Sequence, residues 1–333
     1  MGNIVIEKSI FKVKQFHKPA DAIAKLTNEQ KDLVARYNKR LTVGEIETEK
    51  VPCLCGSEKF NLVASVDYFS FSQNTVICVN CGLIQSNPRL TQKSYKEFYT
   101  SDTYRLCYEG VDFLEAAHAR MNISYGKHIF NEVNCVKPVE RGVKVLEVGA
   151  GGGWNLIAFK NAGADVLGMD YSPKLVKFGN ESGIQMTEGG LDAAKGEYDI
   201  ILLNHVFEHL LDPIANLKFL TDRLTPGGVL YIAVPNILNF GIGQLQNAHT
   251  YYFSPETFKL YVEQAGFRLL KFGEAASIHM FGIFSVSQST VTQATLKGHY
   301  RFMRKFLAKQ QLKQQFITLL RVIGAYSIIQ RLR

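Results

Sequence analysis

The chain contains 333 residues with a formal net charge of +8, and 46% of its residues are hydrophobic and 20% charged. This composition is typical of a soluble protein, and the length is sufficient for two domains. A run of about 18 apolar residues, which a membrane-spanning helix needs, does not occur. The N-terminus also lacks the apolar core of a signal peptide. We therefore expect a cytoplasmic protein.

The first elements expected along the chain are helical. Residues 1–50 are predicted to form a helical preamble, because LTNEQKDLVARYNKRL carries a capping-box pattern with Thr27 at the N-cap and Gln30 three positions later. Residues 51–108 contain short strand-like pieces and turns, and residues 111–136 are predicted to form another helix. A preamble and a small module thus precede the main domain.

The small module at residues 51–108 holds five of the six cysteines, and four of these form two close pairs. Two close pairs of thiols are typical of a tetrahedral zinc site, because thiolates at short spacing chelate the ion without needing a large core. The second pair has the common C-x-x-C-G spacing, whereas the first pair is C-x-C, tighter than usual. We expect a structural Zn²⁺ on these cysteines, and we expect Cys107 and Cys135 to be buried thiols. The expected zinc ligands are Cys53, Cys55, Cys78 and Cys81.

From Val143 onward the pattern alternates between strands and helices. The expected strands are VKVLEV, ADVLGMD, YDIILLNHV and GGVLYIAVPN, followed by FRLLKFGEA and HMFGIFSVSQS as sheet-edge strands. The helices include WNLIAFKNAG with Gly163 as a C-cap candidate, SPKLVKFGNESG with Ser172 as the N-cap, and the capped segment SPETFKLYVEQAG. This alternation predicts an α/β fold with a mostly parallel, doubly wound, Rossmann-like sheet.

The glycine-rich stretch VLEVGAGGGWNL joins the first of these strands to the first helix. A dinucleotide fingerprint, G-x-G-x-x-G/A, fails because the sixth position is Trp154 when counted from Gly149 and Leu156 when counted from Gly151. A P-loop fails as well, because no Lys-Ser or Lys-Thr follows the glycines. The pattern that remains is E-x-G-x-G-x-G.

This pattern resembles the first motif of class I S-adenosylmethionine-dependent methyltransferases. The resemblance implies that the glycines let the backbone approach the methionine part of the cofactor, that Glu147 helps to orient its ammonium group, and that Asp170 accepts both ribose hydroxyls. Residues 109–290 are then the methyltransferase domain. The expected cofactor-binding residues are Glu147, Gly149, Gly151, Gly153, Asp170, Tyr171, Asn204 and His205.

The resemblance continues through YDIILLNHVFEHLLDP, LTPGGVLYIAVPN and HTYYFSPETFKLYVEQAGF, so that it covers residues 143–287. Methyl transfer to most oxygen nucleophiles needs a base that takes the proton. His249, on the loop that normally faces the substrate, is our first choice for the catalytic base. His205 is the alternative, and His209 is expected to structure the cofactor pocket.

The cysteine module and its continuation NPR…FY…YR resemble the zinc-binding N-terminal domain of bacterial sugar methyltransferases. This implies an acceptor that is a sugar or a sugar-linked small molecule, such as a sugar nucleotide or a glycolipid, in surface polysaccharide or secondary metabolite biosynthesis. The carbon-methylating members carry a further C-terminal α/β domain that has no counterpart here, so oxygen or nitrogen is at least as good an acceptor as carbon. The expected substrate-binding residues are Tyr104, Arg105, Tyr251 and Tyr252.

An RNA methyltransferase that grips RNA with its zinc module is the rival hypothesis. A nucleic-acid surface should be basic with interleaved aromatic residues, whereas the charges of residues 51–108 are close to balanced. The segment NHVFEH also stands where enzymes that methylate base amines show [DNS]-P-P-[YFW]. Nucleic acid is therefore not the expected partner.

The tail at residues 291–333 is basic and amphipathic. It contains no acidic residue, because the last acid of the chain is Glu274, and large apolar residues recur in it at steps of mostly three and four. One hypothesis is a helix pair packed on the catalytic domain or on a second copy of the chain in a homo-oligomer. The other is an interfacial helix on the inner face of an anionic membrane, which would suit a lipid-linked acceptor.

Overall fold

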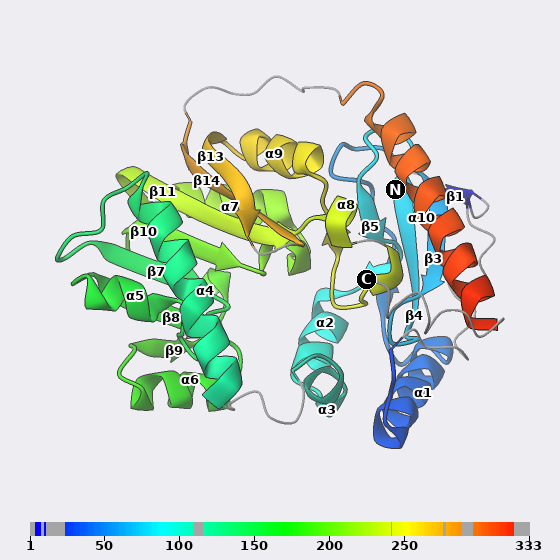
Figure 1. Ribbon diagram of the computed structural model, residues 1–333, viewed down its shortest axis with the longest axis horizontal. Coiled ribbons are helices and arrows are strands. Elements are labelled where there is room, and N and C mark those ends of the chain that lie inside the picture. The colour runs from blue at the N-terminus through cyan, green and yellow to red at the C-terminus, as the bar shows by residue number, and fades with distance from the viewer. Residues whose placement is uncertain are drawn as a thin grey trace. The chain divides into compact units, whose positions relative to one another are not determined.

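The computed structural model describes residues 4–7, 10, 24–109, 116–240, 242–275, 278–287 and 296–322. The chain divides into two compact units, and most of their helices and strands are labelled in Figure 1. The first unit comprises Met1–Ser94, Phe240–Tyr252 and Thr295–Arg333, and the second comprises Tyr95–Asn239 and Phe253–Ala294. Three separate stretches of sequence thus build the first unit, and two build the second.

The first unit contains a five-stranded sheet of order β1-β3-β4-β5-β12. Only β1 and β3 pair in parallel, and the other neighbours are antiparallel. The strands are β1 (Val5–Glu7), β3 (Lys59–Val66), β4 (Ser72–Cys78), β5 (Ile84–Ser86) and β12 (Tyr251–Tyr252). A separate two-stranded ribbon pairs β2 (Thr48–Glu49) with β6 (Arg89–Leu90).

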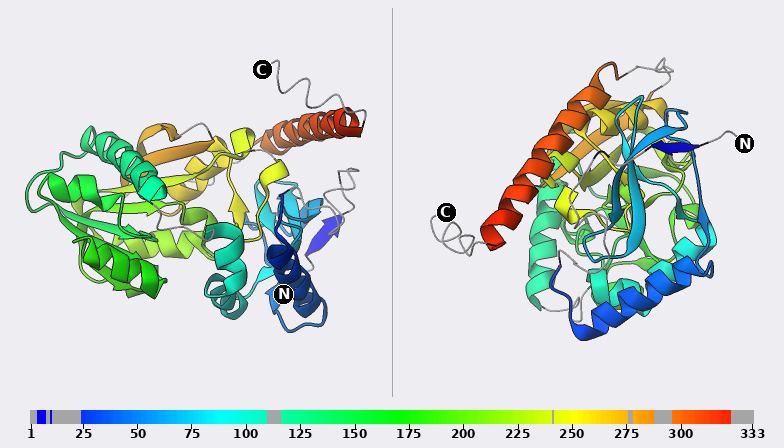
Figure 2. Two further views of the ribbon diagram at one scale, coloured as in Figure 1. Left: turned by 60° about the horizontal axis from the view of Figure 1, so that its bottom comes forward. Right: turned by 90° about the vertical axis from the view of Figure 1, so that its right-hand side faces the viewer.

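Among the described residues, two α-helices belong entirely to the first unit. In α1 (Asn28–Thr42), Gln30 N donates to Thr27 Oγ1 at 3.2 Å and Thr27 N donates to Gln30 Oε1 at 2.9 Å, which confirms the predicted capping box. The prediction of an entirely helical preamble is wrong, because β1 joins the sheet through backbone hydrogen bonds that its sequence does not reveal. The second helix, α10 (His299–Val322), is one continuous rod in both views of Figure 2. The tail beyond it, residues 323–333, lies outside the described residues.

The second unit contains a seven-stranded sheet of order β13-β14-β11-β10-β7-β8-β9. The five strands from β11 to β9 are parallel, and β14 runs antiparallel to both of its neighbours. This confirms the predicted α/β sheet. Of the two strands predicted at a sheet edge, β13 is an edge strand, whereas β14 lies inside the sheet. The strands are β7 (Lys144–Val148), β8 (Asp165–Asp170), β9 (Met186–Glu188), β10 (Tyr198–Asn204), β11 (Leu224–Pro235), β13 (Phe267–Ala275) and β14 (His279–Val286).

The described α-helices of the second unit are α3 (Asp102–Tyr104), α4 (Ala116–Asn134), α5 (Leu156–Asn161), α6 (Pro173–Glu181), α7 (Pro213–Thr221) and α9 (Pro255–Gln264). Helix α8 (Ile237–Phe240) crosses the boundary between the units in the sequence, because Phe240 belongs to the first unit. Helix α2 (Gln92–Tyr99) spans the boundary between the units in the sequence, and short π- or 3₁₀-helical turns cover Arg105–Glu109, Leu191–Ala193, Phe207–His209 and, in the first unit, Ile242–Gln244. Ser172 occupies the predicted N-cap position of α6, although its side chain accepts no capping hydrogen bond from the described residues. Ser254 caps α9 and forms a capping box with Thr257.

Both faces of the large sheet are buried. Ile200 and Leu202 of β10 share a core with Ile129 of α4 and Phe159 of α5. The intervening residues of β10 are buried as well, and successive side chains of a strand point to opposite faces. Because both faces are covered, ligands reach such a sheet at the ends of its strands.

Candidate active site and cysteine cluster

The loop between β7 and α5 requires glycine. The φ angle is +69° at Gly149, +56° at Gly151 and +77° at Gly153, in the left-handed region that side chains disfavour. A β-carbon at Gly149 would also lie only 2.5 Å from Cγ2 of Val206. The loop therefore presents bare backbone at the carboxyl end of β7, where doubly wound folds bind their ligands.

Strand β7 places a buried acid just before this loop. Glu147 is completely buried, and its Oε1 accepts a hydrogen bond from Nδ2 of Asn155 at 2.7 Å. Its other oxygen, Oε2, has no hydrogen-bond partner among the residues that the structure describes. Burial raises the pKa of Glu147 to about 8, and the Asn155 hydrogen bond acts in the opposite direction. A buried carboxyl oxygen without a partner favours a ligand that brings a donor or a positive charge.

Asp170, at the end of β8, is joined to the glycine loop. Its Oδ2 accepts a hydrogen bond from Gly151 N at 2.9 Å, and its Oδ1 accepts one from Ser172 N at 2.9 Å. Burial raises the pKa of Asp170, and these two N–H groups act against that rise. The next residue, Tyr171, is 56% exposed. The strand end is thus fixed against the loop, and an exposed aromatic ring lies beside it in the sequence.

The end of β10 contributes two more of the predicted residues. Asn204 Oδ1 is buried, and no described residue forms a hydrogen bond with it. His205 has a φ of +57°, which is uncommon for a residue with a side chain, and its N–H donates to Ala233 O at 3.0 Å. Because Val206 lies against Gly149, this strand end and the glycine loop are neighbours.

His205 has two titratable neighbours that sequence reasoning missed. Its Nδ1 lies 3.2 Å from Oε1 of Glu208, and its ring lies 4.2 Å from the ring of His279 in an edge-to-face arrangement. Burial lowers the pKa of His279 to about 4, and the nearby His205 adds to this lowering. The three-residue spacing of His205 and Glu208 could have indicated their contact, whereas only the pairing of β11 with β14 positions His279.

His209 is held in the same unit by two tyrosines. Tyr95 OH donates to His209 O at 2.6 Å, and Tyr99 OH lies 2.5 Å from His209 Nδ1. The rings of Tyr99 and Tyr104 have centroids 4.4 Å apart, and Tyr104 stacks on Tyr108 at 5.2 Å. The predicted substrate residue Tyr104 is therefore a half-buried member of an aromatic cluster, and its neighbour in the sequence, Arg105, is exposed.

The other predicted acceptor residues belong to the first unit. His249, Tyr251 and Tyr252 are buried there. Ser86 Oγ donates to His249 O at 2.9 Å, Arg89 Nη1 donates to Tyr251 OH at 3.3 Å, and β12 pairs with β5. These residues support the five-stranded sheet, whereas the glycine loop, Asp170 and His205 belong to the second unit.

A family model described as "Methyltransferase domain" matches residues 100–271, which is more than half of the chain. The chain belongs to this methyltransferase family. S-adenosylmethionine is the methyl donor of the family, and the matched segment contains the glycine loop, Asp170 and His205.

Curated relatives of this methyltransferase match over a shorter segment. A ubiquinone biosynthesis O-methyltransferase of Xanthomonas campestris is 32% identical over 105 residues, covering 28% of this chain and 44% of the relative. The corresponding protein of Cereibacter sphaeroides is 31% identical over 105 residues, covering 29% and 42%. The chain thus spans less than half the length of these curated relatives. Among solved structures, magnesium protoporphyrin IX methyltransferase from Synechocystis is similar at 16% identity and a TM-score of 0.43, over 58% of this chain and 95% of that one.

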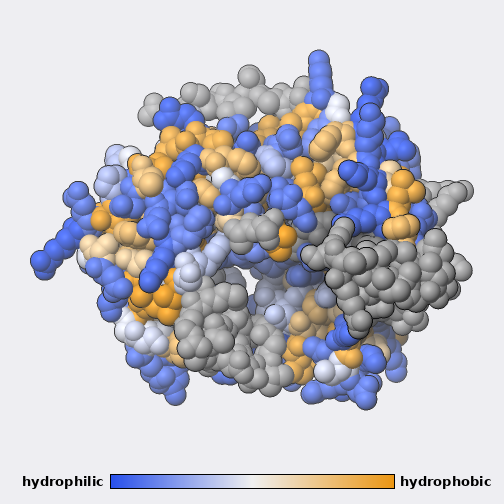
Figure 3. Space-filling model, in the orientation of Figure 1, coloured by the Kyte–Doolittle hydropathy of each residue, from blue (hydrophilic) through white to orange (hydrophobic). Residues whose placement is uncertain are grey.

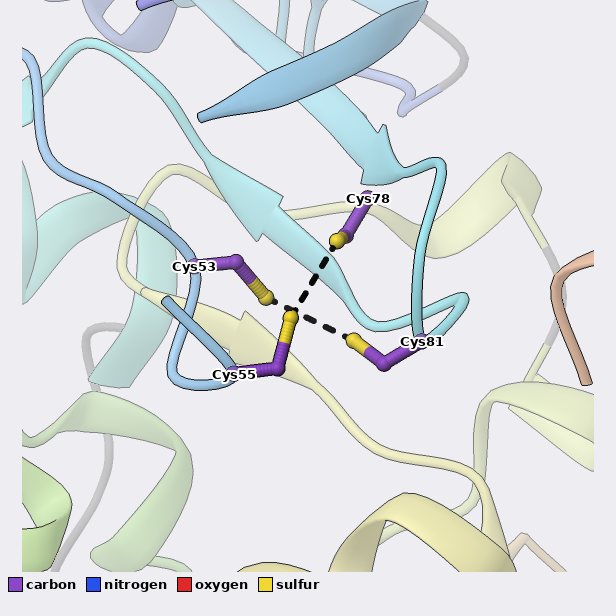
Figure 4. Close-up of side chains that lie close together, drawn as sticks. All are labelled: Cys53, Cys55, Cys78 and Cys81. Atoms are coloured by element: carbon purple, nitrogen blue, oxygen red, sulfur yellow. Dashed lines mark hydrogen bonds between the residues drawn. The ribbon is translucent and has the colours of Figure 1, made fainter. Parts of the chain in front are cut away.

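Four cysteines of the methyltransferase converge in the first unit. Cys53 and Cys55 precede β3, Cys78 ends β4, and Cys81 lies in the turn before β5. The Sγ atoms of Cys53 and Cys81 are 3.5 Å apart, those of Cys55 and Cys78 are 3.6 Å apart, and all four lie within 4.8 Å of one another. Figure 4 shows the four side chains pointing toward a common centre.

The cysteine cluster has the dimensions of a zinc site. Tetrahedral Zn²⁺ with Zn–S bonds of about 2.3 Å separates its sulfur ligands by roughly 3.8 Å, close to the two distances observed. Cys107 is buried as expected, but the expectation for Cys135 is wrong because that thiol is exposed.

The described helices of the methyltransferase include none that is long and apolar enough to cross a membrane.

Proposed function

We propose that the protein transfers a methyl group from S-adenosylmethionine to a sugar or sugar-linked small molecule, such as a sugar nucleotide or a glycolipid. The observation that supports methyl transfer best is the glycine loop, whose backbone is hydrogen-bonded to Asp170 and which follows the buried Glu147. The family match supports the same donor. The resemblance of the cysteine module to that of sugar methyltransferases supports the acceptor class.

The residues of the second unit fit S-adenosylmethionine. Glu147 Oε2 and Asn204 Oδ1 are buried acceptors that lack partners among the described residues, as expected where a cationic ligand with several donors binds. The positive φ angles of Gly149 and Gly151 keep side chains out of the loop. Asp170 can accept further hydrogen bonds, because a carboxylate has about four acceptor sites. When bound, the cofactor supplies a methyl group on a sulfonium, whose C–S bond breaks with the electron pair left on sulfur as the acceptor atom bonds to carbon and loses its proton.

Replacing Asp170 tests this cofactor site. Asp170→Ala removes a partly buried acceptor and the hydrogen bond that holds Gly151 N, so we expect binding of S-adenosylmethionine to weaken by about 1–3 kcal/mol, or roughly 5- to 150-fold in Kd. Calorimetry gives the affinity directly. The control is Asp165→Ala, an exposed acid at the opposite end of the same strand. Equal affinities for the wild type and Asp170→Ala would remove Asp170 from the site.

Two histidines, His249 and His205, are candidates for the catalytic base. His249 precedes the aromatic segment that faces the substrate in similar enzymes, but it belongs to the first unit. His205 directly follows β10, its neighbour Val206 lies against Gly149 of the glycine loop, and its side chain is 29% exposed.

Two observations support the proposed acceptor. The aromatic cluster supports a sugar ring, and the names of the relatives support oxygen as the methylated atom. Tyr99, Tyr104 and Tyr108 form stacked or tilted ring pairs in the second unit, and aromatic faces with hydroxyl groups suit the apolar and polar sides of a sugar ring. The exposed Arg105 beside them could pair with a diphosphate. The names of the relatives specify O-methylation, which favours oxygen as the acceptor atom.

The direct test offers radiolabelled S-adenosylmethionine together with nucleoside-diphosphate sugars, glycolipids, quinol precursors or ribosomal RNA. We expect the label to enter a sugar-containing acceptor, and mass spectrometry then locates the methylated atom. Label found only in RNA would replace the sugar proposal with the RNA alternative. Label found only in the phenolic precursors would favour an acceptor like that in the names of the relatives.

We also propose that α10 lies against an anionic membrane. Its inner face is packed in the first unit, with Met303 and Leu307 almost completely buried. The opposite face exposes Phe302, Leu312 and Phe316, which are 48%, 66% and 58% exposed. The basic residues of the helix are Arg301, Arg304, Lys305, Lys309, Lys313 and Arg321, and it contains no acid.

This composition favours a negatively charged apolar surface as the partner of α10. Figure 3 shows hydrophilic and hydrophobic residues next to one another on the surface in the region of α10. Each cation near an anionic bilayer contributes on the order of 1 kcal/mol, and the contribution falls as salt is added. If the acceptor is a glycolipid, binding of α10 to the membrane would bring the enzyme close to its acceptor.

Point variants test the membrane proposal without removing the packed inner face. We expect full-length protein to sediment with vesicles of phosphatidylglycerol and phosphatidylcholine at low salt, and Phe302→Ser combined with Phe316→Ser to abolish this while the melting temperature stays the same. Gln315→Ser, an exposed polar position of the same helix, is the matched control. Wild-type protein that stays in the supernatant at low salt contradicts the proposal.

A further inference from the structure

His205 and Glu208 form a close pair at the turn that follows β10. The distance between His205 Nδ1 and Glu208 Oε1 is 3.2 Å, so Glu208 contacts the Nδ1 atom of the ring. The second ring nitrogen, Nε2, is not part of this contact. The exposure of the two side chains differs strongly, at 29% for His205 and 1% for Glu208. A buried carboxylate thus contacts a ring that solvent and small molecules can reach.

Several titratable side chains of the second unit lie near this pair, and their protonation states decide which of them can carry a positive charge beside Glu208. Burial lowers the pKa of His279 to about 4, so this neighbour is neutral at pH 7. Burial also raises the pKa of the nearby phenols of Tyr95 and Tyr99, and it raises that of Tyr125 to about 12, so all three are neutral as well. Among the described residues of the second unit, His209 is a further basic group near this pair, with its Nε2 4.0 Å from Glu208 Oε1 and its Nδ1 beside Tyr99 OH.

The backbone at His205 supports a functional role. Its φ of +57° is one that glycine adopts without strain, yet a histidine occupies the position and a backbone hydrogen bond to Ala233 holds it there. Strained side-chain-bearing residues of this kind cluster at active sites, where the surrounding structure keeps them in place. The next residue, Val206, lies against Gly149, so the turn that carries the pair also contacts the glycine loop.

We infer that Glu208 is a positioning residue that holds the ring of His205 so that Nε2 takes the proton of the acceptor during methyl transfer. The inference rests on the proposed function and extends it by naming the group that selects the ring nitrogen. With Nδ1–H donating to the carboxylate, Nε2 carries the free lone pair in the neutral ring. The acceptor proton then passes to Nε2, and the carboxylate stabilises the imidazolium that forms.

The first test reads the ring itself and needs neither cofactor nor acceptor. Histidine side-chain ¹⁵N spectra of the wild type, with His205 assigned by comparison with His205→Gln, should show the tautomer protonated at Nδ1 once the ring is neutral. Glu208→Gln should reduce the population of that tautomer. The matched control is Glu132→Gln, which alters a carboxylate 4.0 Å from His128 on α4 and should leave the His205 signals unchanged.

The second test uses turnover once an acceptor is found. We expect Glu208→Gln to lower kcat by at least about tenfold while the Kd for S-adenosylmethionine stays the same, and to move the acidic limb of the pH–rate profile to lower pH. A wild-type ring protonated at Nε2, or an unmoved acidic limb in Glu208→Gln, would overturn the inference. The tautomer result stands apart from the proposed function, because the ring can be positioned as described even in a protein that methylates a different acceptor.

Discussion

Serine at both Cys78 and Cys81 is expected to remove zinc from the protein and to unfold the sheet of the first unit. The two cysteines flank the turn between β4 and β5, and they supply half of the four sulfur atoms. Structural zinc contributes an apparent binding free energy of about 10–16 kcal/mol in zinc-finger peptides at neutral pH. Two remaining thiolates hold the ion far more weakly than four, so most of that contribution should be lost.

Elemental analysis and limited proteolysis measure this effect. Wild-type protein purified without chelators should contain one zinc per chain, and the double variant should contain none and be cleaved in residues 51–94 at protease levels that the wild type withstands. Cys135→Ser, at an exposed thiol, should match the wild type. A metal-free wild type that is equally resistant would show that the cluster is a set of packed thiols.

Alanine at the catalytic base is expected to lower turnover by about 10²- to 10⁴-fold, the usual contribution of general base catalysis. We expect this for His205→Ala, because its ring is partly exposed beside the glycine loop and a buried carboxylate contacts it. The Kd for S-adenosylmethionine should change much less. Steady-state kinetics and calorimetry on one preparation separate the two quantities.

His249→Ala is the comparison that decides between the two histidines. Its side chain is buried in the first unit, and we expect its replacement to act mainly through stability, seen as a lower melting temperature. A loss of turnover of about 10²-fold or more in His249→Ala, with a normal melting temperature and normal cofactor affinity, would assign the base to His249 instead.

The parts of the fold that could be predicted are those governed by local sequence. The capping box at Thr27 and Gln30 depends on residues three positions apart, and both of its hydrogen bonds form. The alternation of apolar strands with helices likewise indicated the parallel sheet. The glycine spacing identified the loop after β7, because three of its glycines need positive φ angles.

The parts that escaped prediction depend on contacts between distant segments. Strand β1 (Val5–Glu7) forms by pairing with β3, which is distant in the sequence. The three residues of β1 do not by themselves predict this pairing. His279 reaches His205 only because β14 inserts between β11 and β13. The aromatic segment around Tyr251 predicts a substrate contact for this residue, whereas the structure shows its ring buried in the first unit and its hydroxyl hydrogen-bonded to Arg89.

Isothermal titration calorimetry of the wild-type protein tests the central claim most directly. S-adenosylhomocysteine, the demethylated product, avoids turnover and keeps the ribose, the carboxylate and the ammonium group that the proposed site would bind. We predict saturable binding at one site per chain and no heat of binding from NAD, because the loop lacks the dinucleotide fingerprint. Saturable binding of NAD together with no binding of S-adenosylmethionine or S-adenosylhomocysteine would contradict the account.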